Sequence, residues 1–263
     1  MRFRRERGSS YVVKKMSLLP VSHPHYPRPL GRLVMQQRWS DLLFLHWSVN
    51  PDTVQRTLPP GLIVDVFQER AWVGIVPFFM EAVRPVGLPA LPWISTFLEV
   101  NVRTYVRDAA GRAGVWFYSL DCNRWPAVQI ARRGFHLPYQ YAGMQAHREP
   151  DGSIAYQCQR RPRSTYPVAS YRYQGTGPVF PAIAGTLEFF LAERYRLFSW
   201  NTGRRQLHTG EVWHHPYPLQ RAEVPEWSSA PAVWNGDFVL EGPPVVQHYA
   251  KGVDVGIFPL LTV

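Results

Sequence analysis

The stretch from Thr96 to Val106 alternates between apolar and polar side chains, which predicts a β-strand. Leu98, Val100, Val102 and Val106 form its apolar face, and Glu99, Asn101, Arg103 and Tyr105 form its polar face. After a turn at 108–112, residues 114–120 are apolar on both faces and predict the hairpin partner of this strand. A strand covered on both sides seldom lies beside one whose polar face is bare. We therefore expect the polar face to line a closed, polar, concave interior.

In such an interior the charges of Glu99 and Arg103 would need partners. A buried carboxylate or guanidinium costs several kcal/mol unless it is paired. Two interpretations stay open: the two side chains line a ligand pocket, or they form a structural ion pair. A plainer alternative is an edge strand with one face in water, in which Glu99 and Arg103 would be exposed.

Hydrophobic patterning elsewhere predicts further strands and three helices. The strands are expected at 39–49, 62–67 paired with 71–79 as a hairpin, 143–148, 153–161, 196–201, 206–213, 217–223 and 244–254. The helices are expected at 51–58, after the N-cap Asn50, at 124–133 and at 185–195. In the last of these, Leu187, Phe190, Leu191 and Arg194 share one face, which places Arg194 on the buried stripe. A Pro-rich loop at 84–95 is of the kind that often borders a site.

At least nine strand candidates against three helices indicate a mainly β (α+β) fold. No internal repeat is present. The pattern favours an antiparallel barrel or sandwich with helices packed outside it or across one end.

The net charge of +10 is concentrated at the N-terminus. Residues 1–35 hold eight basic residues and one acid, so they carry +7 of the charge and residues 36–263 carry +3. We predict a basic, Pro-rich, disordered tail over 1–35 and one domain over 36–263. The near-balanced domain gives no reason to expect specific nucleic-acid binding.

The chain offers no apolar run of the length of a signal peptide or membrane span, so we expect a cytoplasmic location. Cys122 and Cys158 are too few for a disulfide framework or a zinc site. No Gly-rich phosphate loop, GxSxG or HExxH motif occurs. We therefore predict no cofactor.

The histidines are better explained as hydrogen-bonded core residues than as ligands. His46 lies within an apolar run and His248 in a predicted strand, while His214 and His215 are adjacent and face opposite ways on a strand. A three-histidine metal site from His46, His214 and His248 is the minor alternative, and our prediction is that no metal is bound.

Several short segments, in their order, resemble the YqjF-like family, domain of unknown function 2071. They are WSDLLFLHWSV (39–49), LPPG (58–61), AWVG (71–74), EVNVRTYV (99–106), GVWFYSLD (114–121), LPY (137–139), LEFFLAERY (187–195), HPYPL (215–219) and HYAKGVDV (248–255). The resemblance covers about residues 36–258, with Tyr217 standing where a Trp is expected. It implies a fold like that of acetoacetate decarboxylase: an antiparallel, barrel-like sheet around an internal cavity, with a few helices packed outside.

Acetoacetate decarboxylases use a lysine pair after an aromatic-Pro step to form a Schiff base with a keto acid. The matching stretch here is Leu137-Pro138-Tyr139-Gln140, with Tyr139 and Gln140 where the lysines would stand. Lys14 and Lys15 lie in the predicted tail, and we expect Lys251 to face solvent. The resemblance therefore implies the cavity without the Schiff-base chemistry, with Glu99 similar to an acidic residue that lines it.

The polar face of the strand at 96–106 and the family resemblance together predict a protein that binds a small, anionic organic molecule in an internal cavity. Glu99 and Tyr139 are the candidate catalytic acid and base, acting on a carbonyl or carboxylate compound. The candidate binding residues are Asn101, Arg103, Tyr105, His136 and Arg194, with Arg103 or Arg194 pairing a carboxylate. The residues leave open whether the protein is an enzyme, a non-catalytic carrier or sensor, or a protein in which the polar face is only an ion-pair network. They also leave a homo-oligomer open.

Overall fold

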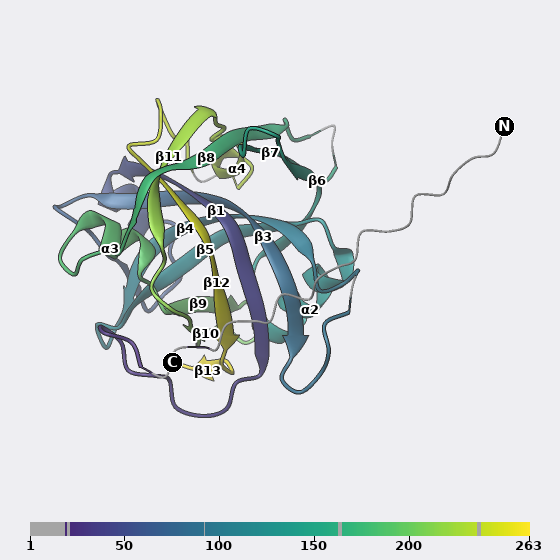
Figure 1. Cartoon of the computed structure of the whole chain (residues 1–263). Helices are drawn as coiled ribbons and strands as arrows, with labels where there is room; N and C mark the ends of the chain where they lie inside the picture. Colours follow the sequence, from purple (N-terminus) through teal and green to yellow (C-terminus); the bar gives the residue numbers. More distant parts are fainter. Residues whose placement is uncertain (1–18, 20–21, 92, 163–164, 236–237) are drawn as a thin grey trace.

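Strands dominate the chain, and those that are described form one thirteen-stranded sheet accompanied by four short helices (Figure 1). The computed structural model describes residue 19 and residues 22–91, 93–162, 165–235 and 238–263. Most of the predicted tail, residues 1–18 and 20–21, lies outside the described residues. None of the described helices is long and apolar enough to cross a membrane.

The elements follow one another along the chain as β1 (Met35–Val49), α1 (Pro51–Gln55), β2 (Leu62–Val64), β3 (Ala71–Pro85), β4 (Phe97–Asp108), β5 (Ala113–Cys122), α2 (Trp125–Phe135), β6 (Tyr139–Arg148), β7 (Ile154–Arg160), β8 (Ala169–Phe180), α3 (Leu187–Ala192), β9 (Arg196–Asn201), β10 (Gln206–Trp213), β11 (Leu219–Glu226), α4 (Ala230–Val233), β12 (Val246–Ile257) and β13 (Leu261–Thr262).

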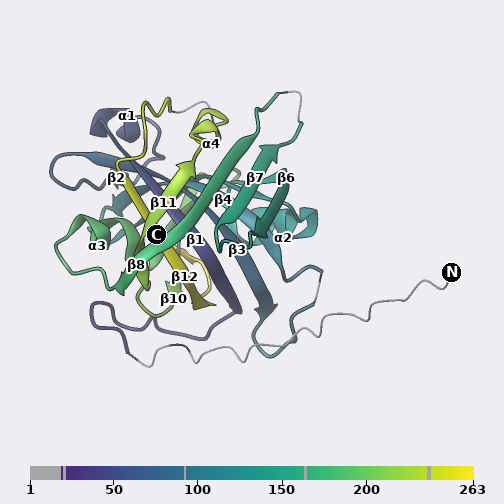
Figure 2. The ribbon, with the colours of Figure 1, turned by 45° about the horizontal axis from the view of Figure 1, so that its top comes forward.

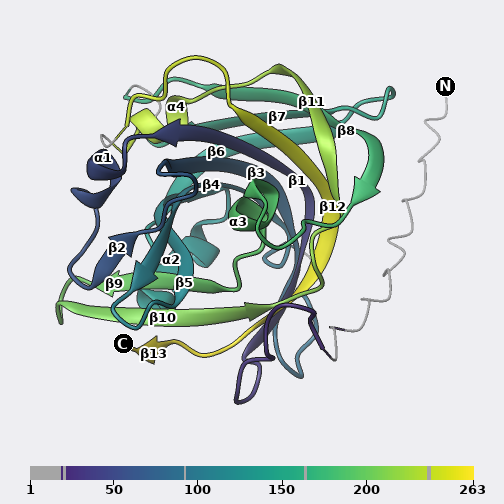
Figure 3. The same ribbon diagram turned by 90° about the vertical axis from the view of Figure 1, so that its left-hand side faces the viewer.

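The sheet closes on itself through two additional strand pairings, β4 with β5 and β10 with β12. One ring of neighbours runs β1-β3-β4-β5-β9-β10-β12, and a larger one runs through β6, β7, β8 and β11 instead of β9 and β10. Figure 2 shows β6, β7, β8 and β11 side by side, and Figure 3 is a view down the axis of the smaller ring. This arrangement confirms the predicted mainly β, barrel-like fold.

Two pairings are parallel, where we expected an antiparallel sheet. Strand β5 pairs in parallel with β6 near Leu120 and with β9 near Val115. Parallel neighbours need a crossover connection, and α2 supplies it between β5 and β6.

Both faces of β4 are buried because this strand belongs to both rings. Val100 and Val102 are fully buried and pack in a core with residues of the larger ring such as Tyr156. Glu99 and Arg103, on the opposite face, are only 2% and 8% exposed. The alternative of an edge strand with one face in water is therefore wrong.

The predicted hairpin of 62–67 with 71–79 is wrong. Strand β2 pairs with the far end of β4, Leu62 opposite Asp108, and not with β3. Only an isolated bridge joins Phe67 to Arg70, across a turn whose two central residues have positive φ. The position of the turn was predicted, because it lies between two apolar segments of the sequence, whereas the partner strand of β2 has no local signal.

Helix α3 is shorter than predicted, ending at Ala192 and not at Tyr195. Glu193 leaves the helical conformation, with φ −88° and ψ 76°, and its buried carboxylate accepts hydrogen bonds from Tyr195 and the backbone of Tyr217. Arg194 therefore follows the helix and does not lie on its face. Strand β8, which contains Gly175, Gly177 and Pro178, was not predicted, and neither were α4 and β13.

The segment before β1 contacts the domain where it is described. The Tyr26 hydroxyl donates to the Glu193 carbonyl at 2.9 Å, and the Tyr26 ring packs against Tyr195. His23 Nε2 lies 2.8 Å from the Tyr195 hydroxyl. The boundary at residue 35 between tail and domain stays a prediction.

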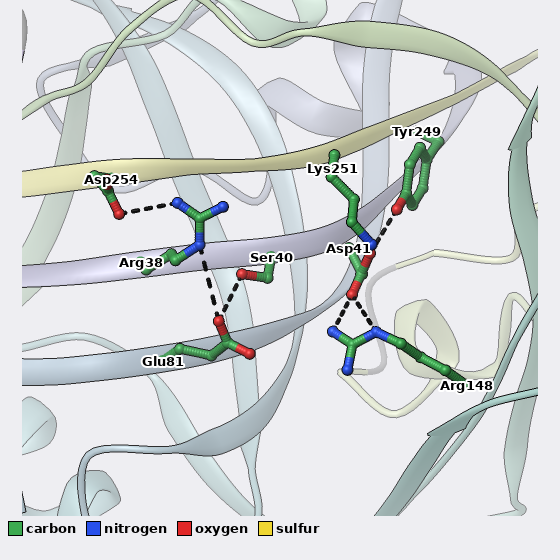
Figure 4. A network of polar contacts seen from close by, with 8 residues as sticks. All are labelled: Arg38, Ser40, Asp41, Glu81, Arg148, Tyr249, Lys251 and Asp254. Carbon is green, nitrogen blue, oxygen red and sulfur yellow. Dashed lines mark hydrogen bonds and ion pairs between the residues drawn. The ribbon is translucent and has the colours of Figure 1, made fainter. Parts of the chain in front are cut away.

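A polar network surrounds a β-bulge in β1 (Figure 4). The register of β1 on β3 shifts between Ser40 and Leu45, and Asp41 has φ 49°. The buried Asp41 carboxylate accepts hydrogen bonds from Arg148, from Tyr249 at 2.5 Å and from Lys251 at 2.8 Å. Burial opposes its ionisation, but these donors outweigh burial and lower the pKa of Asp41.

Lys251 is thus an ion-pair partner whose side chain is 68% exposed. Beside this network, Arg38 pairs with Asp254 at 3.0 Å, and Ser40 donates to Glu81 at 2.8 Å. These contacts tie β1 to β3 and β12 across the bulge.

Candidate functional site

A cavity of about 600 Å³ lies inside the smaller ring, and each of its seven strands contributes to the lining. Most lining side chains are apolar, so the interior is less polar than the pattern of β4 suggested. Helix α3 lies across one end of the ring, as seen in Figure 3, and the lining at the other end includes residues of α2 and of the segment after β3. The loop predicted to border a site contributes Leu88, Pro89, Leu91 and Ile94.

Glu99 and Tyr139 meet in the lining of the cavity. The Tyr139 hydroxyl donates to Glu99 Oε2 at 2.7 Å, and both side chains are buried. Burial raises the pKa of Glu99 to about 8, although hydrogen bonds from Tyr139 and Asn101 oppose the rise. Burial and the neighbouring Glu99 raise the pKa of Tyr139 well above its ordinary value. At neutral pH the pair therefore holds a mostly protonated carboxyl group and a neutral phenol.

The crossover after β5 places Tyr139 in the cavity. Tyr139 is the first residue of β6 and pairs with Leu120 of β5, while Gln140 follows on the opposite face. The Gln140 side chain accepts a hydrogen bond from Arg132 at 2.8 Å and is not part of the lining. Of the two positions that resemble the lysine pair, only Tyr139 reaches the cavity.

Arg103 brings a buried positive charge to the lining. Its Nη2 donates to the Leu191 carbonyl at 3.1 Å, but its Nε has no hydrogen-bond partner. The neighbouring Asn101 Oδ1 is also buried without a partner. Within the described residues, no salt bridge joins Arg103 to Glu99 or to another acid. A direct Glu99–Arg103 ion pair is therefore not what buries this face of β4.

Arg194 also lines the cavity, but its charge is already paired. Its Nη1 lies 2.9 Å from Asp65 Oδ2, and its Nε donates to the Phe190 carbonyl at 2.7 Å. Between the two arginines proposed to pair a carboxylate, the structure leaves Arg103 as the one without an acidic partner in the described chain.

Tyr105 and His136 are not part of the cavity lining. Tyr105 is fully buried, donates to the Leu191 carbonyl at 2.8 Å and lies 2.7 Å from His46 Nε2. Tyr105 therefore lies beyond Arg103 along β4, at the end of the ring that α3 covers. His136 ends α2 in the left-handed conformation and lines a second hollow with Asn201, on the other side of β5.

The histidines of the minor alternative have separate partners. His46 contacts Tyr105, His214 Nδ1 lies 2.6 Å from the His215 carbonyl, and the His248 ring lies edge-on to Phe180. Burial lowers the pKa of His214 to about 3. In the part of the chain that the structure describes, no group of three His, Cys, Asp or Glu side chains is placed to hold a metal ion.

Five polar lining residues were not among the predicted site residues: Gln37, Arg84, Ser95, Arg196 and Tyr217. Arg196 is paired with Glu211 at 2.5 Å. Tyr217 is buried, and the sequence marked it only as a departure from the family pattern. No alternating stretch points to these positions, because each comes from a different strand or loop.

The fold is that of acetoacetate decarboxylase-like proteins. Acetoacetate decarboxylase from Legionella pneumophila superposes with a TM-score of 0.62 at 14% identity, covering 92% of this chain and 93% of that one. The enduracididine biosynthesis enzyme MppR complexed with pyruvate superposes with a TM-score of 0.61 at 12% identity, covering 91% and 94%. At these identities the likeness establishes the fold.

The family follows from the sequence comparisons. Residues 36–254 match the family DUF2071, described as uncharacterized conserved protein (COG2071). Uncharacterized protein YqjF from Bacillus subtilis (strain 168) is 36% identical over 232 residues, which is 88% of this chain and 93% of that protein. The chain belongs to the DUF2071 family, as the resemblance of its segments indicated.

No lysine lines the cavity among the described residues, so Schiff-base trapping is expected to fail. Incubation with acetoacetate followed by borohydride should leave the mass of the intact protein unchanged. The same treatment of an acetoacetate decarboxylase provides the positive control. A reduced adduct mapped to Lys251 would contradict this expectation and would mean that Lys251 leaves Asp41 to act as the nucleophile.

Proposed function

We propose that this protein binds a small organic anion in the central cavity and acts on it by acid/base chemistry without a lysine Schiff base. Arg103 pairs with the carboxylate of the ligand, Asn101 contributes a hydrogen-bond acceptor, and Glu99 with Tyr139 faces a carbonyl group. This function needs no cofactor.

The observation that carries the proposal is the unpaired Arg103 guanidinium. A charge that is 8% exposed and lacks an acidic partner among the described residues is costly to the folded state. A bound carboxylate would supply the missing counter-ion and the missing acceptor for Nε. Buried, unsatisfied polar groups that face a cavity are features of a binding site.

Glu99 and Tyr139 support proton transfer. With a pKa of about 8, Glu99 exists in both protonation states near neutral pH, as a general acid or base requires. On a 2-oxo acid, the ionised carboxylate would accept a proton from the carbon next to the carbonyl, and Tyr139 would donate a hydrogen bond to the oxygen that gains charge. Return of the proton from Glu99 restores the starting groups.

The choice of probe rests on a fold neighbour. MppR is complexed with pyruvate in its structure, which shows that this fold can hold a 2-oxo acid. Pyruvate carries one carboxylate and one carbonyl and matches the two kinds of polar group in this cavity. We therefore take pyruvate as the first ligand to test.

Replacement of Arg103 by Met is expected to weaken pyruvate binding about tenfold or more, a loss of about 1.4 kcal/mol or more. Arg194→Met is the matched control, since Arg194 lines the same cavity but is paired with Asp65. Isothermal titration calorimetry of both variants at pH 7 measures the difference. Equal affinity of the Arg103 variant and the wild type would reject the proposed carboxylate site.

A non-catalytic carrier or sensor is the second candidate, and the mainly apolar lining favours it. A carrier would bind the ligand through Arg103 without exchanging its hydrogens. An enzyme that uses Glu99 as a base would exchange the hydrogens next to the carbonyl with solvent, so exchange separates the two candidates.

A further inference from the structure

We infer that the preferred ligand is a carboxylate with an apolar chain, whose acid group lies near Arg103 and whose chain fills the cavity toward α2. In chemical terms this is a medium-chain 2-oxo acid or a similar amphipathic acid. The inference rests on the proposed function and names the class of its ligand.

The cavity is larger than a small acid requires. A cavity of about 600 Å³ matches the space of roughly twenty water molecules at about 30 Å³ each. A ligand with the few atoms of pyruvate would occupy a small part of it. Because most of the lining is apolar, water in the remainder would find few hydrogen-bond partners. A matching apolar group would replace that water favourably.

The lining residues of β4 change from polar to apolar along the strand. On one face of this strand the residues run Arg103, Asn101, Glu99 and Phe97, from the α3 end toward the opposite end. Six residues of an antiparallel strand span about 20 Å. Along β4 the charged and amide groups therefore come first, and the strand presents an apolar side chain beyond Glu99, while Gln37, Arg84 and Ser95 are the polar lining residues at that far end. Phe78 and Met80 of β3 lie beside this apolar part.

Large apolar side chains surround the open end of the cavity. Leu88, Leu91 and Ile130 line the cavity and are also 58%, 55% and 56% exposed. Side chains that touch both the cavity and solvent mark its mouth. A mouth built from large apolar side chains suits an apolar chain better than a hydrated ion. Ala127 and Ala131 of α2, just inside, leave room beside them because their side chains are small.

The test compares 2-oxo acids that share one head group: pyruvate, 2-oxobutanoate, 2-oxohexanoate and 2-oxooctanoate. Each added methylene group buried in the cavity should tighten binding about fourfold. Isothermal titration calorimetry with the full chain measures the series. Affinity that does not rise with chain length, while pyruvate binding still depends on Arg103, would overturn this inference and leave the proposed function standing.

Ala131→Trp fills the apolar part and is expected to weaken 2-oxooctanoate binding about tenfold or more, with pyruvate affinity unchanged within about twofold. Arg133→Trp is the control, because Arg133 is exposed on the same helix and does not line the cavity. Long-chain binding that is equally strong in Ala131→Trp would place the chain elsewhere and overturn the inference.

A second variant covers the case that Ala131→Trp does not fold. Leu88→Gln changes an exposed side chain at the mouth and should weaken the long acid by about threefold or more, again sparing pyruvate. Equal affinity of this variant and the wild type for the long acid would overturn the inference. Failure of every acid, short or long, to bind would reject both this inference and the proposed function.

Discussion

Asp121→Asn is expected to lower the free energy of unfolding by about 3–5 kcal/mol. Asp121 of β5 and Arg160 of β7 form a two-point ion pair, Nε to Oδ1 at 2.7 Å and Nη2 to Oδ2 at 2.7 Å. Their side chains are 0% and 6% exposed. Removing the carboxylate charge leaves a buried guanidinium with only neutral acceptors, the Trp234 carbonyl and the Asn235 side chain.

The measurement is urea denaturation of the variant and the wild type at pH 7. Asp151→Asn is the control, because Asp151 pairs with Arg172 at 3.7 Å on the surface, where an ion pair contributes little to stability. A loss below about 1 kcal/mol for Asp121→Asn would mean that water or another acid reaches Arg160. Replacing both partners by apolar residues of similar size should restore part of the lost stability.

Glu99→Gln is expected to remove a pH dependence of stability. In the folded state the pKa of Glu99 is about 8, against an ordinary 4.5. Below the ordinary pKa both states bind the proton. As the pH rises from about 4.5 to 8, only the unfolded chain releases it, so folding stability falls by about 1.4 kcal/mol per pH unit from this group. Above pH 8 this loss is complete.

The variant should therefore match the wild type near pH 5 and be more stable by more than about 2 kcal/mol at pH 8. Denaturation curves across this range measure the difference, with Glu81→Gln as a control outside the cavity lining. Parallel pH profiles of the wild type and the Glu99 variant would mean that the folded carboxyl titrates in its ordinary range.

The same variant separates enzyme from carrier. In D₂O, exchange of the hydrogens next to the carbonyl of pyruvate should rise about tenfold per pH unit until it levels near pH 8, because the base form of Glu99 is needed. Glu99→Gln should abolish it. Binding without exchange in the wild type would identify the carrier. Proton NMR of the ligand follows the exchange.

The sequence by itself determined which face of β4 carries which side chains. Alternation sends Glu99 and Arg103 to one side and Val100 to the other, whatever the partner strands are. The next strand is apolar on both faces, which implied that both faces of β4 are covered, and the burial of the β4 side chains confirms it. The family and its fold were also visible, because short segments kept their order along the chain. The replacement of the lysine pair by Tyr139 and Gln140 could be read directly.

Tertiary structure decided which strands meet, because pairing joins residues that are distant in the chain. The register of β2 on β4 and the two parallel pairings of β5 have no local signal. Tyr139 reaches Glu99, forty residues earlier, only because the α2 crossover returns the chain beside β5.

The same long-range contacts decided which polar residues remain unpaired. Asp65 comes from a distant segment to neutralise Arg194, and α3 covers Tyr105, while no acid in the described chain reaches Arg103. A hydrophobic pattern fixes the face of a strand on which a charge lies. Only the closed sheet determines whether that charge meets a counter-ion or an empty cavity.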